Sequence, residues 1–334
     1  METRVLPTDT SETLEKAVAG AVDLLTSGEC VALPTETVYG LAADALRSDA
    51  VVKIFEAKDR PFFDPLIVHL PAREWLERLT RVESPLVARL IDAFWPGPLT
   101  LVLPRRELVP DMVTAGLPTV AVRMSAHPVF RAVATRFGKP LAAPSANRFG
   151  RISPTVAEHV HAELGGRIPL IVDGGAARDG IESTIVALDG ETIKVLRSGP
   201  VTANELAQFG NMQAVVPGVM PQAPGQLTSH YAPRTPLLWW YSGEGRRQEQ
   251  PIESMEVGFR RGLLAWRTGA PDRFFERVEI LSPSGDLREA AATLFAKLRR
   301  LDEAGLDFIF AEAVPERGLG VAIMDRLRKA ATHE

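Results

Sequence analysis

The sequence contains a single cysteine, Cys30, among its 334 residues. One thiol can form neither an internal disulfide nor a cysteine-based zinc site, and such scarcity is typical of proteins from a reducing compartment. Cys30 begins an apolar run that ends at Leu33. We therefore interpret its side chain as part of the core rather than as a nucleophile.

Long apolar segments are also missing. No run approaches the roughly 18 apolar residues that a membrane span requires. The N-terminus has an acid at Glu2 and no apolar stretch of the kind found in secretory signals. We therefore expect a cytoplasmic protein without a membrane partner. Because one domain usually holds about 100 to 200 residues, the length indicates two domains.

The chain has no excess of positive charge, since 38 Lys and Arg stand against 42 Asp and Glu. The balance is also local: residues 1–201 hold 22 basic and 25 acidic side chains, and residues 237–334 hold 15 and 16. Nucleic-acid binding relies on clustered Lys and Arg. We therefore expect at most weak direct binding of nucleic acid, and any positive site has to be a local pocket.

Four common catalytic or nucleotide-binding signatures are absent from the sequence. There is no Gly-x-x-x-x-Gly-Lys-Ser/Thr loop and no Gly-x-Gly-x-x-Gly turn between a strand and a helix. There is also no His-Glu-x-x-His zinc motif and no Gly-x-Ser-x-Gly elbow. A ligand of this protein has to be bound by another architecture.

What the sequence does contain is an alternation of strand-like and helix-like segments, which predicts an α/β fold. Five prolines between Pro217 and Pro236 are typical of a linker. We predict a first domain over 1–203, a Pro-rich linker over 204–236 and a small α/β domain over 237–334. Apolar residues recur at helical spacing from Leu14 to Leu25 and predict a first helix that Gly28 ends. The other predicted helices are 49–57, 84–94, 129–137, 155–164, 286–301 and 321–331, and the predicted strands are 31–33, 66–70, 99–103, 119–124, 141–143, 170–172, 183–188, 192–196, 236–241, 262–266 and 308–311.

Polar residues gather at the ends of the predicted strands, and each group allows a structural and a functional interpretation. The stretch from Pro34 to Gly40 is either a turn with local threonine bonds or a set of donors for a small polar ligand. Lys58 and Arg60 either clamp phosphate oxygens or form a solvated helix end. His69 shares a strand face with Ile67, as a half-buried histidine or a ligand contact.

Two arginines are predicted to lie within strands. Arg123 shares a face with Thr119 and Ala121, and Arg197 shares one with Ile193. Burying an unpaired guanidinium is costly, so each arginine requires an anion, either an internal acid or a substrate. Small residues over 142–147, with Ser153 close behind, permit a ligand to approach the backbone. Together these groups favour a concave anion site.

Seven motifs occur in the order found in the YrdC/Sua5 family, over roughly residues 10–200, and the chain resembles that family. They are Pro34–Leu41, Lys58–Pro61 with Pro65–His69, Trp95–Thr100, Val122–Arg123, Pro144–Asn147, Ser183–Ile185 and Arg197–Gly199. The segment Ser229–Pro233 and the second domain resemble the longer, two-domain Sua5 type. This resemblance implies an open, twisted mixed sheet with helices around a concave cavity, and a small Rossmann-like C-terminal α/β domain.

The resemblance also implies an activity, that of a threonylcarbamoyl-AMP synthase. Such an enzyme is a nucleotidyltransferase that converts L-threonine, bicarbonate and ATP to threonylcarbamoyl-AMP and pyrophosphate. The product is handed to a separate transferase complex that makes threonylcarbamoyladenosine in tRNA. We expect Mg²⁺ to accompany ATP and no metal to be held tightly by the protein.

Site residues follow from the same resemblance. The threonine site is expected to comprise Thr37, His69, Arg123, the Ala143 backbone and Ser183, with Arg123 on the carboxylate. The ATP site is expected to comprise Lys58, Arg60, Asp64, Thr119, Ser145, Asn147, Ser153, Arg197 and Tyr231, with Lys58 and Arg60 also catalytic. Asp64 departs from the family pattern, which often has Asn there, and a carboxylate near a triphosphate requires Mg²⁺ or a neighbouring cation.

The mechanism expected from these residues relies on positioning and charge neutralisation, because the motifs contain no obvious general base. The linker is interpreted as a lid that protects labile intermediates from water, with a passive tether as the alternative. Two rival functions are an RNA-binding protein that uses the cavity and a carbamoyl transferase related to hydrogenase maturation. The second rival has less support, since the acylphosphatase and zinc-finger segments expected with it are absent.

Overall fold

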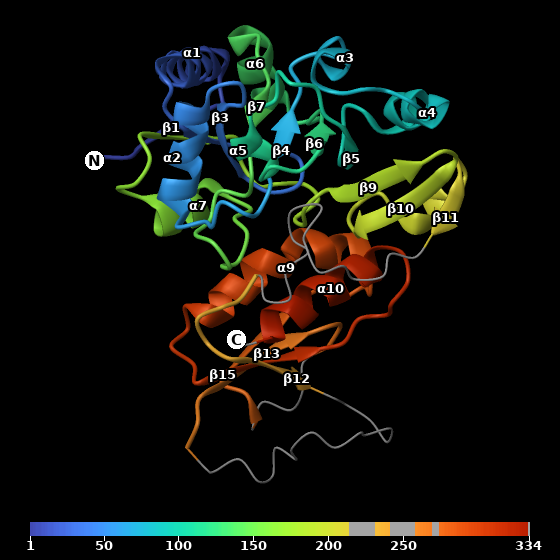
Figure 1. Cartoon of the computed structure of the whole chain (residues 1–334). Helices are drawn as coiled ribbons and strands as arrows, with labels where there is room; N and C mark the ends of the chain where they lie inside the picture. Colours follow the sequence, from blue (N-terminus) through green and yellow to red (C-terminus); the bar gives the residue numbers. More distant parts are fainter. Residues whose placement is uncertain (214–230, 241–257, 269–273, 333–334) are drawn as a thin grey trace. The chain divides into compact units, whose positions relative to one another are not determined.

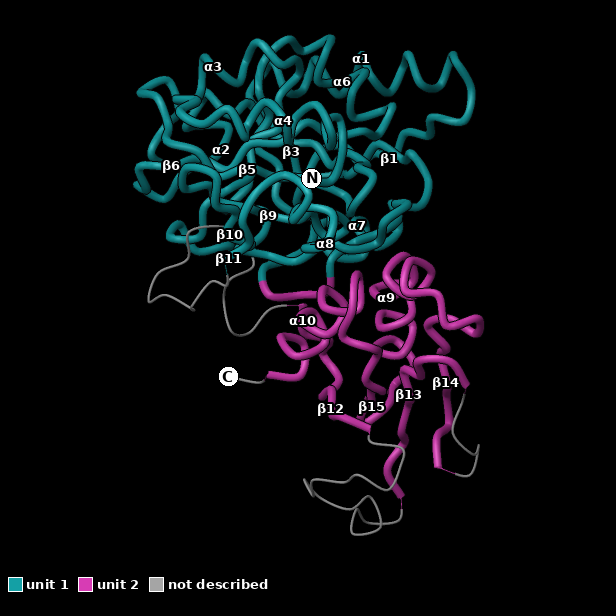
Figure 2. Tube along the Cα trace, turned by 90° about the vertical axis from the view of Figure 1, so that its right-hand side faces the viewer, with its two compact units in different colours: residues 1–149, 153–227 teal, residues 150–152, 228–334 magenta. Residues whose placement is uncertain are grey.

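The computed structural model describes residues 1–213, 231–240, 258–268 and 274–332. The chain divides into two compact units, each with its own sheet (Figure 2). Unit 1 comprises residues 1–149 and 153–227, and unit 2 comprises residues 150–152 and 228–334. Of the predicted linker, residues 214–230 lie outside the described residues, so its interpretation as a lid stays a prediction.

Unit 1 is built on a mixed sheet of eleven strands, and unit 2 on a parallel sheet of four (Figure 1). The predicted α/β class and the two-domain fold are therefore confirmed. The strands are β1 (Arg4–Pro7), β2 (Val31–Leu33), β3 (Gly40–Asp44), β4 (Ile67–His69), β5 (Leu99–Pro104), β6 (Thr119–Arg123), β7 (Leu141–Ala142), β8 (Leu170–Asp173), β9 (Thr184–Asp189), β10 (Thr192–Arg197), β11 (Asn211–Gln213), β12 (Leu237–Trp240), β13 (Arg261–Ala265), β14 (Arg277–Ile280) and β15 (Phe308–Glu312).

Two of the longer helices, α1 and α9, begin at residues whose side chains cap the first turn. In α1 the Thr10 side chain accepts the N–H of Thr13, whose hydroxyl accepts the N–H of Thr10, and Gly28 ends the helix at φ 84°. In α9 the Asp286 carboxylate caps two N–H groups of the first turn. The helices are α1 (Ser11–Ser27), α2 (Ser48–Lys58), α3 (Trp75–Leu79), α4 (Pro85–Phe94), α5 (Asp111–Thr114), α6 (Pro128–Phe137), α7 (Ala157–Leu164), α8 (Ala203–Leu206), α9 (Leu287–Asp302) and α10 (Leu319–Ala331).

The strand order in unit 1 is β1-β8-β2-β3-β7-β4-β6-β5-β9-β10-β11. Successive side chains along a strand point to opposite faces of the sheet, so they pack into different cores. In β4, Val68 belongs to the core that contains residues of α2, α4 and α7, whereas Ile67 points to the other face. That other face is divided between a core with α1 and α6 and a small apolar patch formed by Ile67, Val102, Ala121 and Ile185.

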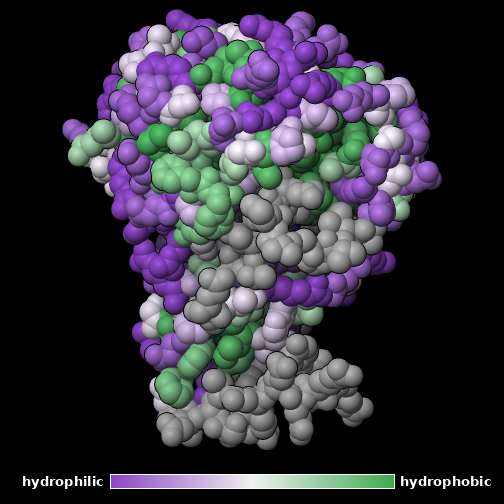
Figure 3. Space-filling view, viewed as in Figure 1, coloured by the Kyte–Doolittle hydropathy of each residue, from purple (hydrophilic) through white to green (hydrophobic). Residues whose placement is uncertain are grey.

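Cys30 lies in the core of unit 1, and burial raises the pKa of its thiol to about 12. Its interpretation as a packing residue therefore agrees with the structure. On the face shown in Figure 3, hydrophilic residues alternate with smaller apolar patches, which suits a chain that is 24% charged. Among the described residues no helix has both the length and the apolar character that crossing a membrane requires.

The structure differs from the sequence-based elements at several places. β1, β3, β14 and the short helices α3, α5 and α8 were not predicted, and α7 begins at Ala157 rather than at residue 155. β11 lies within the segment predicted as linker and pairs with β10. The sheet of unit 1 therefore includes residues beyond 203, the predicted end of the first domain.

Candidate functional site

The turn that joins β2 to β3 is organised by Thr35. Its hydroxyl accepts the N–H groups of Thr37 (3.1 Å) and Val38 (3.2 Å) and donates to the Val38 carbonyl (2.6 Å). These local bonds fit the structural interpretation of the stretch. They also fix the neighbouring Thr37 hydroxyl, which lies 2.9 Å from the Thr35 hydroxyl, so the turn becomes one wall of a polar cluster.

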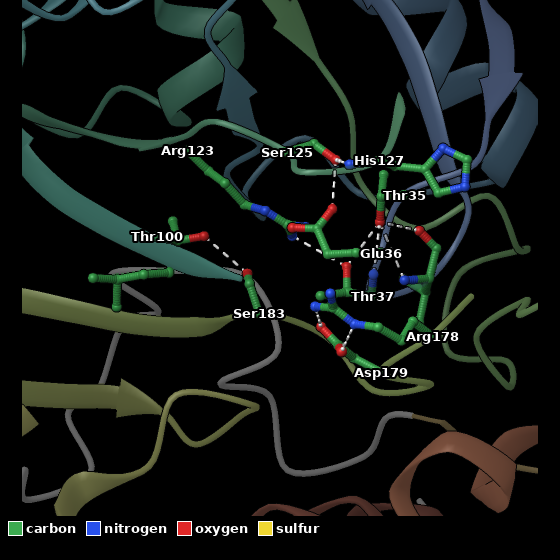
Figure 4. Close-up of polar contacts among 12 residues, drawn as sticks. Thr35, Glu36, Thr37, Thr100, Arg123, Ser125, His127, Arg178, Asp179 and Ser183 are labelled. Carbon is green, nitrogen blue, oxygen red and sulfur yellow. Dashed lines mark hydrogen bonds and ion pairs between the residues drawn. The ribbon is translucent and has the colours of Figure 1, made fainter. Parts of the chain in front are cut away.

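Arg123, the last residue of β6, is held by this turn (Figure 4). Its guanidinium donates to the Thr37 hydroxyl (3.1 Å) and to the Glu36 carboxylate (2.7 Å), and Ser125 donates to the second Glu36 oxygen (2.5 Å). Burial would raise the pKa of Glu36, but Arg123 and Ser125 outweigh it and lower the pKa to about 2. Arg123 is therefore one half of a buried ion pair, and its Nε has no hydrogen-bond partner among the described residues.

His69 lies directly opposite Arg123 in the parallel register of β4 and β6. Its side chain is 2% exposed and its ring contacts Phe130 at 4.7 Å between centroids. Burial, with a further contribution from Arg123, lowers the pKa of His69 to about 3, so the imidazole is neutral at physiological pH. Its Nδ1 has no hydrogen-bond partner in the described part of the chain. A neutral, buried ring with an unused nitrogen is suited to a polar ligand group.

Ser183 precedes β9, and the register places it at the same end of the sheet as Arg123, because β5 pairs antiparallel with β6 and parallel with β9. Its hydroxyl lies 2.8 Å from that of Thr100 and 3.1 Å from the Arg197 guanidinium, which also donates to the Ser183 carbonyl (3.0 Å). The Ala143 N–H donates to the Ile67 carbonyl (2.9 Å). The strand ends thus bring together the five residues predicted for threonine. We call Glu36, Thr37, His69, Arg123 and Ser183 the carboxyl-end cluster.

Lys58, at the end of α2, is buried rather than solvated, so the alternative of a solvated helix end is wrong. Its ammonium donates to the carbonyls of Ser145 (2.6 Å) and Asn147. Burial and the nearby Arg60 lower the pKa of Lys58 well below its usual value. Lys58 therefore fixes the turn of small residues with a buried nitrogen.

Arg60 is also buried, and its nearest acid is Asp64, with 2.9 Å between Nη2 and Oδ2. Its guanidinium donates to the Pro65 carbonyl (2.9 Å) and lies 6.0 Å from the Phe149 ring centroid. Burial raises the pKa of Asp64 although Arg60, Lys58 and Arg197 act to lower it. The neighbouring cation that Asp64 was expected to require is thus present within the protein.

Thr119 begins β6, so it lies at the opposite end of that strand from Arg123. Four residue steps of about 3.3 Å separate the two by roughly 13 Å. Asp64 and Pro65 precede β4, which is parallel to β6, and therefore lie at the Thr119 end. We call Lys58, Arg60, Asp64 and Thr119 the amino-end cluster. On the face that carries Arg123, the apolar patch around Ala121 lies between the two clusters.

Ser153 donates to the Glu182 carboxylate (2.5 Å), which is buried beside Ser183. The Asn147 amide donates to the Arg148 carbonyl (2.7 Å). The sequence does not predict the roles of Glu182 and of the Glu36–Ser125 pair. The available signal was an acid directly before two of the predicted threonine contacts, Glu36 before Thr37 and Glu182 before Ser183.

Tyr231 belongs to unit 2. Its ring stacks on Phe295 at 5.5 Å, lies 5.5 Å from the Arg326 guanidinium carbon and is 1% exposed. The residue has a left-handed backbone, with φ 66°. The structure therefore gives Tyr231 a packing role in its own unit, and its predicted contact with ATP stays a prediction.

Among the described residues no group of three or more His, Cys, Asp and Glu side chains could hold a metal ion. The acid nearest the predicted phosphate contacts, Asp64, is paired with Arg60. A divalent cation that arrives already chelated by a polyphosphate is compatible with this donor set, because such a cation keeps most of its ligands from phosphate and water.

Two family models together match almost the whole chain. Residues 23–199 match the Sua5_yciO_yrdC model, described as "Telomere recombination". Residues 201–332 match the model described as "Threonylcarbamoyl-AMP synthase, C-terminal domain". The boundary between the two matches lies close to residue 203.

Curated relatives are similar over nearly the full length. The chain is 42% identical to threonylcarbamoyl-AMP synthase of Bacillus subtilis (strain 168), covering 97% of this chain and 95% of the relative. It is 40% identical to the enzyme of that name from Pyrococcus abyssi (strain GE5 / Orsay), covering 93% and 92%. A crystal structure of P. abyssi Sua5 complexed with L-threonine matches with a TM-score of 0.87 at 38% identity, covering 99% of this chain and 98% of that one.

Proposed function

Since this chain belongs to the two-domain Sua5 family of threonylcarbamoyl-AMP synthases, we propose that it joins L-threonine, bicarbonate and ATP into threonylcarbamoyl-AMP and pyrophosphate. The observation that carries the chemistry is the pair of buried polar clusters at opposite ends of β4 and β6. They lie roughly 13 Å apart along β6. An amino acid at one end and a triphosphate at the other can therefore meet over the apolar patch.

The carboxyl-end cluster is suited to threonine. The Arg123 guanidinium faces the Glu36 carboxylate and Thr37, and its unpaired Nε is a donor for the threonine carboxylate. The neutral His69 and the Ser183 hydroxyl provide contacts for the ammonium and hydroxyl groups. P. abyssi Sua5 has been crystallised with L-threonine, and we assign the same ligand to this cluster.

The amino-end cluster is suited to the phosphates of MgATP. The Arg60 guanidinium pairs with Asp64 and the Lys58 nitrogen donates to two backbone carbonyls, so two nitrogen donors suited to phosphate oxygens lie in this cluster. The turn at Ser145–Asn147, which Lys58 holds through two carbonyls, presents small residues that allow close approach of a ligand to the backbone. We assign ATP to this cluster together with Ser153 and Arg197, and Mg²⁺ arrives bound to the phosphates.

The reaction we propose has two steps. The deprotonated threonine amine attacks the bicarbonate carbon and forms the N–C bond of a carbamate. The C–O bond to the bicarbonate hydroxyl breaks, and the hydroxide takes up the proton that the nitrogen loses, so that water leaves. A carbamate oxygen then attacks the α-phosphorus of ATP in line, and the bond to pyrophosphate breaks. Glu36 and His69, with pKa values of about 2 and 3, are weak bases. Positioning and neutralisation by Lys58, Arg60 and Arg197 therefore supply most of the acceleration.

The product is an activated carbamoyl group on an adenylate. We infer that a separate transferase complex passes it to tRNA, because neither half of this chain has a basic excess. The same balance disfavours the rival function of an RNA-binding protein.

The decisive measurement is pyrophosphate release from ATP by the purified full-length chain. We expect release that requires both L-threonine and bicarbonate, with omission of either as the control. Pyrophosphate release that is independent of threonine would contradict the proposal. RNA binding that weakens with salt and needs no ATP, without pyrophosphate release, would favour the rival instead.

A further inference from the structure

Unit 2 includes a short segment that interrupts unit 1 in the sequence. Residues 150–152 belong to unit 2, although residues up to Phe149 and from Ser153 onward belong to unit 1. Inside unit 2, Arg151 forms a β-bridge with Ala232, whose N–H donates to the Gly150 carbonyl (2.8 Å). We call residues 150–152 the inserted segment.

Arg299 of α9 provides the side-chain contact to this segment. Its Nη2 donates to the Ile152 carbonyl (2.7 Å), and both residues are buried, at 6% and 2% exposure. Phe295, one helical turn earlier on α9, stacks on Tyr231, the residue before Ala232. One face of α9 therefore contacts both strands of the bridge that holds the inserted segment.

The residues on either side of the inserted segment are those assigned to ATP. On one side, the Phe149 N–H donates to the Lys58 carbonyl (2.8 Å), and Lys58 in turn holds the Asn147 carbonyl. On the other side, Ser153 donates to Glu182 (2.5 Å). Since peptide geometry fixes the distance between consecutive residues, a displacement of residues 150–152 has to move Phe149 or Ser153.

We propose that Arg299 is a positioning residue for nucleotide binding, which acts through the Ile152 carbonyl on the loop that carries Asn147 and Ser153. This inference rests on the proposed function, because the loop is assigned to ATP there. It gives the C-terminal unit a role in the reaction without any contact between Arg299 and a substrate. A guanidinium bonded to a buried carbonyl is suited to the task, because loss of the donor leaves a buried acceptor unsatisfied.

The test compares Arg299→Gln with Arg300→Gln in the full-length chain. Arg300 is the matched control, because it follows Arg299 on α9 but its side chain is 60% exposed and pairs with Glu279 at 3.5 Å. For Arg299→Gln we expect the KM for ATP to rise about tenfold. The dissociation constant for L-threonine, measured calorimetrically without ATP, stays unchanged. Arg299→Lys recovers part of the loss, since it keeps a charged donor without the planar fork.

A second variant perturbs the inserted segment itself. Gly150 has φ 77° and no heavy atom within 4 Å of an added Cβ, so Gly150→Ala strains the segment without a clash. If Arg299 acts through this segment, combining Gly150→Ala with Arg299→Gln raises the KM for ATP little more than the single change that raises it most. If Arg299→Gln does not unfold cooperatively on heating, and so is not properly folded, the test is made with Gly150→Ala and Arg299→Lys instead.

Three results overturn the proposal. They are an ATP KM in Arg299→Gln equal to that of the control, an equal loss of threonine affinity, and multiplicative effects in the double variant. Equilibrium binding of ATP is measured beside turnover. A wild-type chain that binds ATP but makes no threonine-dependent pyrophosphate contradicts the proposed function, whereas a fully active chain that is insensitive to Arg299 contradicts only this inference.

Discussion

The two polar clusters of unit 1 are both buried, yet they balance charge differently. In the carboxyl-end cluster one guanidinium, Arg123, faces one carboxylate, Glu36, with a neutral His69 opposite. In the amino-end cluster Arg60 pairs with Asp64, and Lys58, whose pKa burial lowers, is acted on by both Asp64 and Glu163. The partners of Glu36 outweigh burial and keep its pKa low, whereas burial outweighs the partners of Asp64 and raises its pKa.

This difference matches the charges of the two proposed ligands. Threonine is a zwitterion with no net charge, so a balanced cluster binds it without leaving an excess charge buried. MgATP keeps a negative charge, which favours the charged forms of Lys58 and Arg60 when the phosphates arrive. Substitutions in the two clusters should therefore have different consequences.

The largest effect is expected at the amino-end cluster. Arg60→Ala removes a cation that the proposed mechanism uses to neutralise charge developing on the phosphates. We expect kcat to fall about 10²- to 10³-fold in pyrophosphate release, the usual cost of one electrostatic contact to a transition state. L-threonine binding, measured separately, is expected to persist.

The control for Arg60→Ala is Arg73→Ala, which removes an arginine that is half exposed and pairs with Asp92. This control should retain wild-type kcat, because exposed ion pairs contribute little. An unchanged kcat in Arg60→Ala would remove Arg60 from the mechanism.

The next effect concerns the balance at the carboxyl-end cluster. Glu36→Gln keeps the shape of the side chain but leaves the Arg123 guanidinium without its buried counter-ion. Removal of one partner from a buried ion pair costs about 3 to 5 kcal/mol, so we expect a loss of about 3 kcal/mol in the free energy of unfolding in urea. Saturating L-threonine should then raise the melting temperature more in the variant than in wild type, because its carboxylate replaces the lost charge.

An equal rise in melting temperature with L-threonine in wild type and Glu36→Gln would contradict this prediction, since it would mean that the ligand carboxylate does not interact with Arg123. Ser125→Ala serves as the graded control. It removes one donor to Glu36 but leaves the ion pair intact, so a smaller loss of about 1 kcal/mol is expected.

Much of this arrangement could be predicted from the sequence where the strand period applies. Alternation along 66–70 and 119–124 placed His69 with Ile67 and Arg123 with Ala121, and the structure confirms both faces. The strand β3 escaped prediction because its sequence, Gly-Leu-Ala-Ala-Asp, lacks the β-branched residues that mark strands. β14 does have the alternation of apolar and charged residues that is typical of a half-buried strand, but the alternation spans only four residues.

The remaining features depend on contacts between distant parts of the chain. Glu36 lies in a turn with no periodicity, and its partner Arg123 is 87 residues away. The inserted segment at 150–152 is recognisable only from its bonds to Ala232 and Arg299. Local propensity carries no information about such pairings, so the motif resemblance could indicate which residues matter but not which of them hold one another.

The smallest expected effect concerns pH and distinguishes the neutral member of the carboxyl-end cluster from its charged pair. Burial lowers the pKa of His69 from its ordinary value of 6.5 to about 3 in the folded chain, so below pH 6.5 the unfolded state binds more protons than the folded state. Stability is therefore complete above pH 6.5 and falls as the pH decreases towards 3. From pH 6.5 to pH 5 the loss is about 2 kcal/mol, at 1.36 kcal/mol per pH unit. Protonation of the Glu36 carboxylate adds a second loss of stability as the pH falls from 4.5 to about 2.

Urea unfolding at pH 7 and pH 5 separates the two groups, because Glu36 remains ionised at both values. His69→Gln should abolish most of the loss between these pH values, whereas His127→Gln, which removes a less buried imidazole whose pKa burial also lowers, should abolish less. If His69→Gln kept the wild-type slope, the imidazole would take up its proton as readily in the folded chain as in the unfolded one. His69 would then be partly charged in the folded protein between pH 7 and pH 5, and the carboxyl-end cluster would no longer combine one ion pair with a neutral ring, as the assignment of a zwitterionic amino acid to it requires.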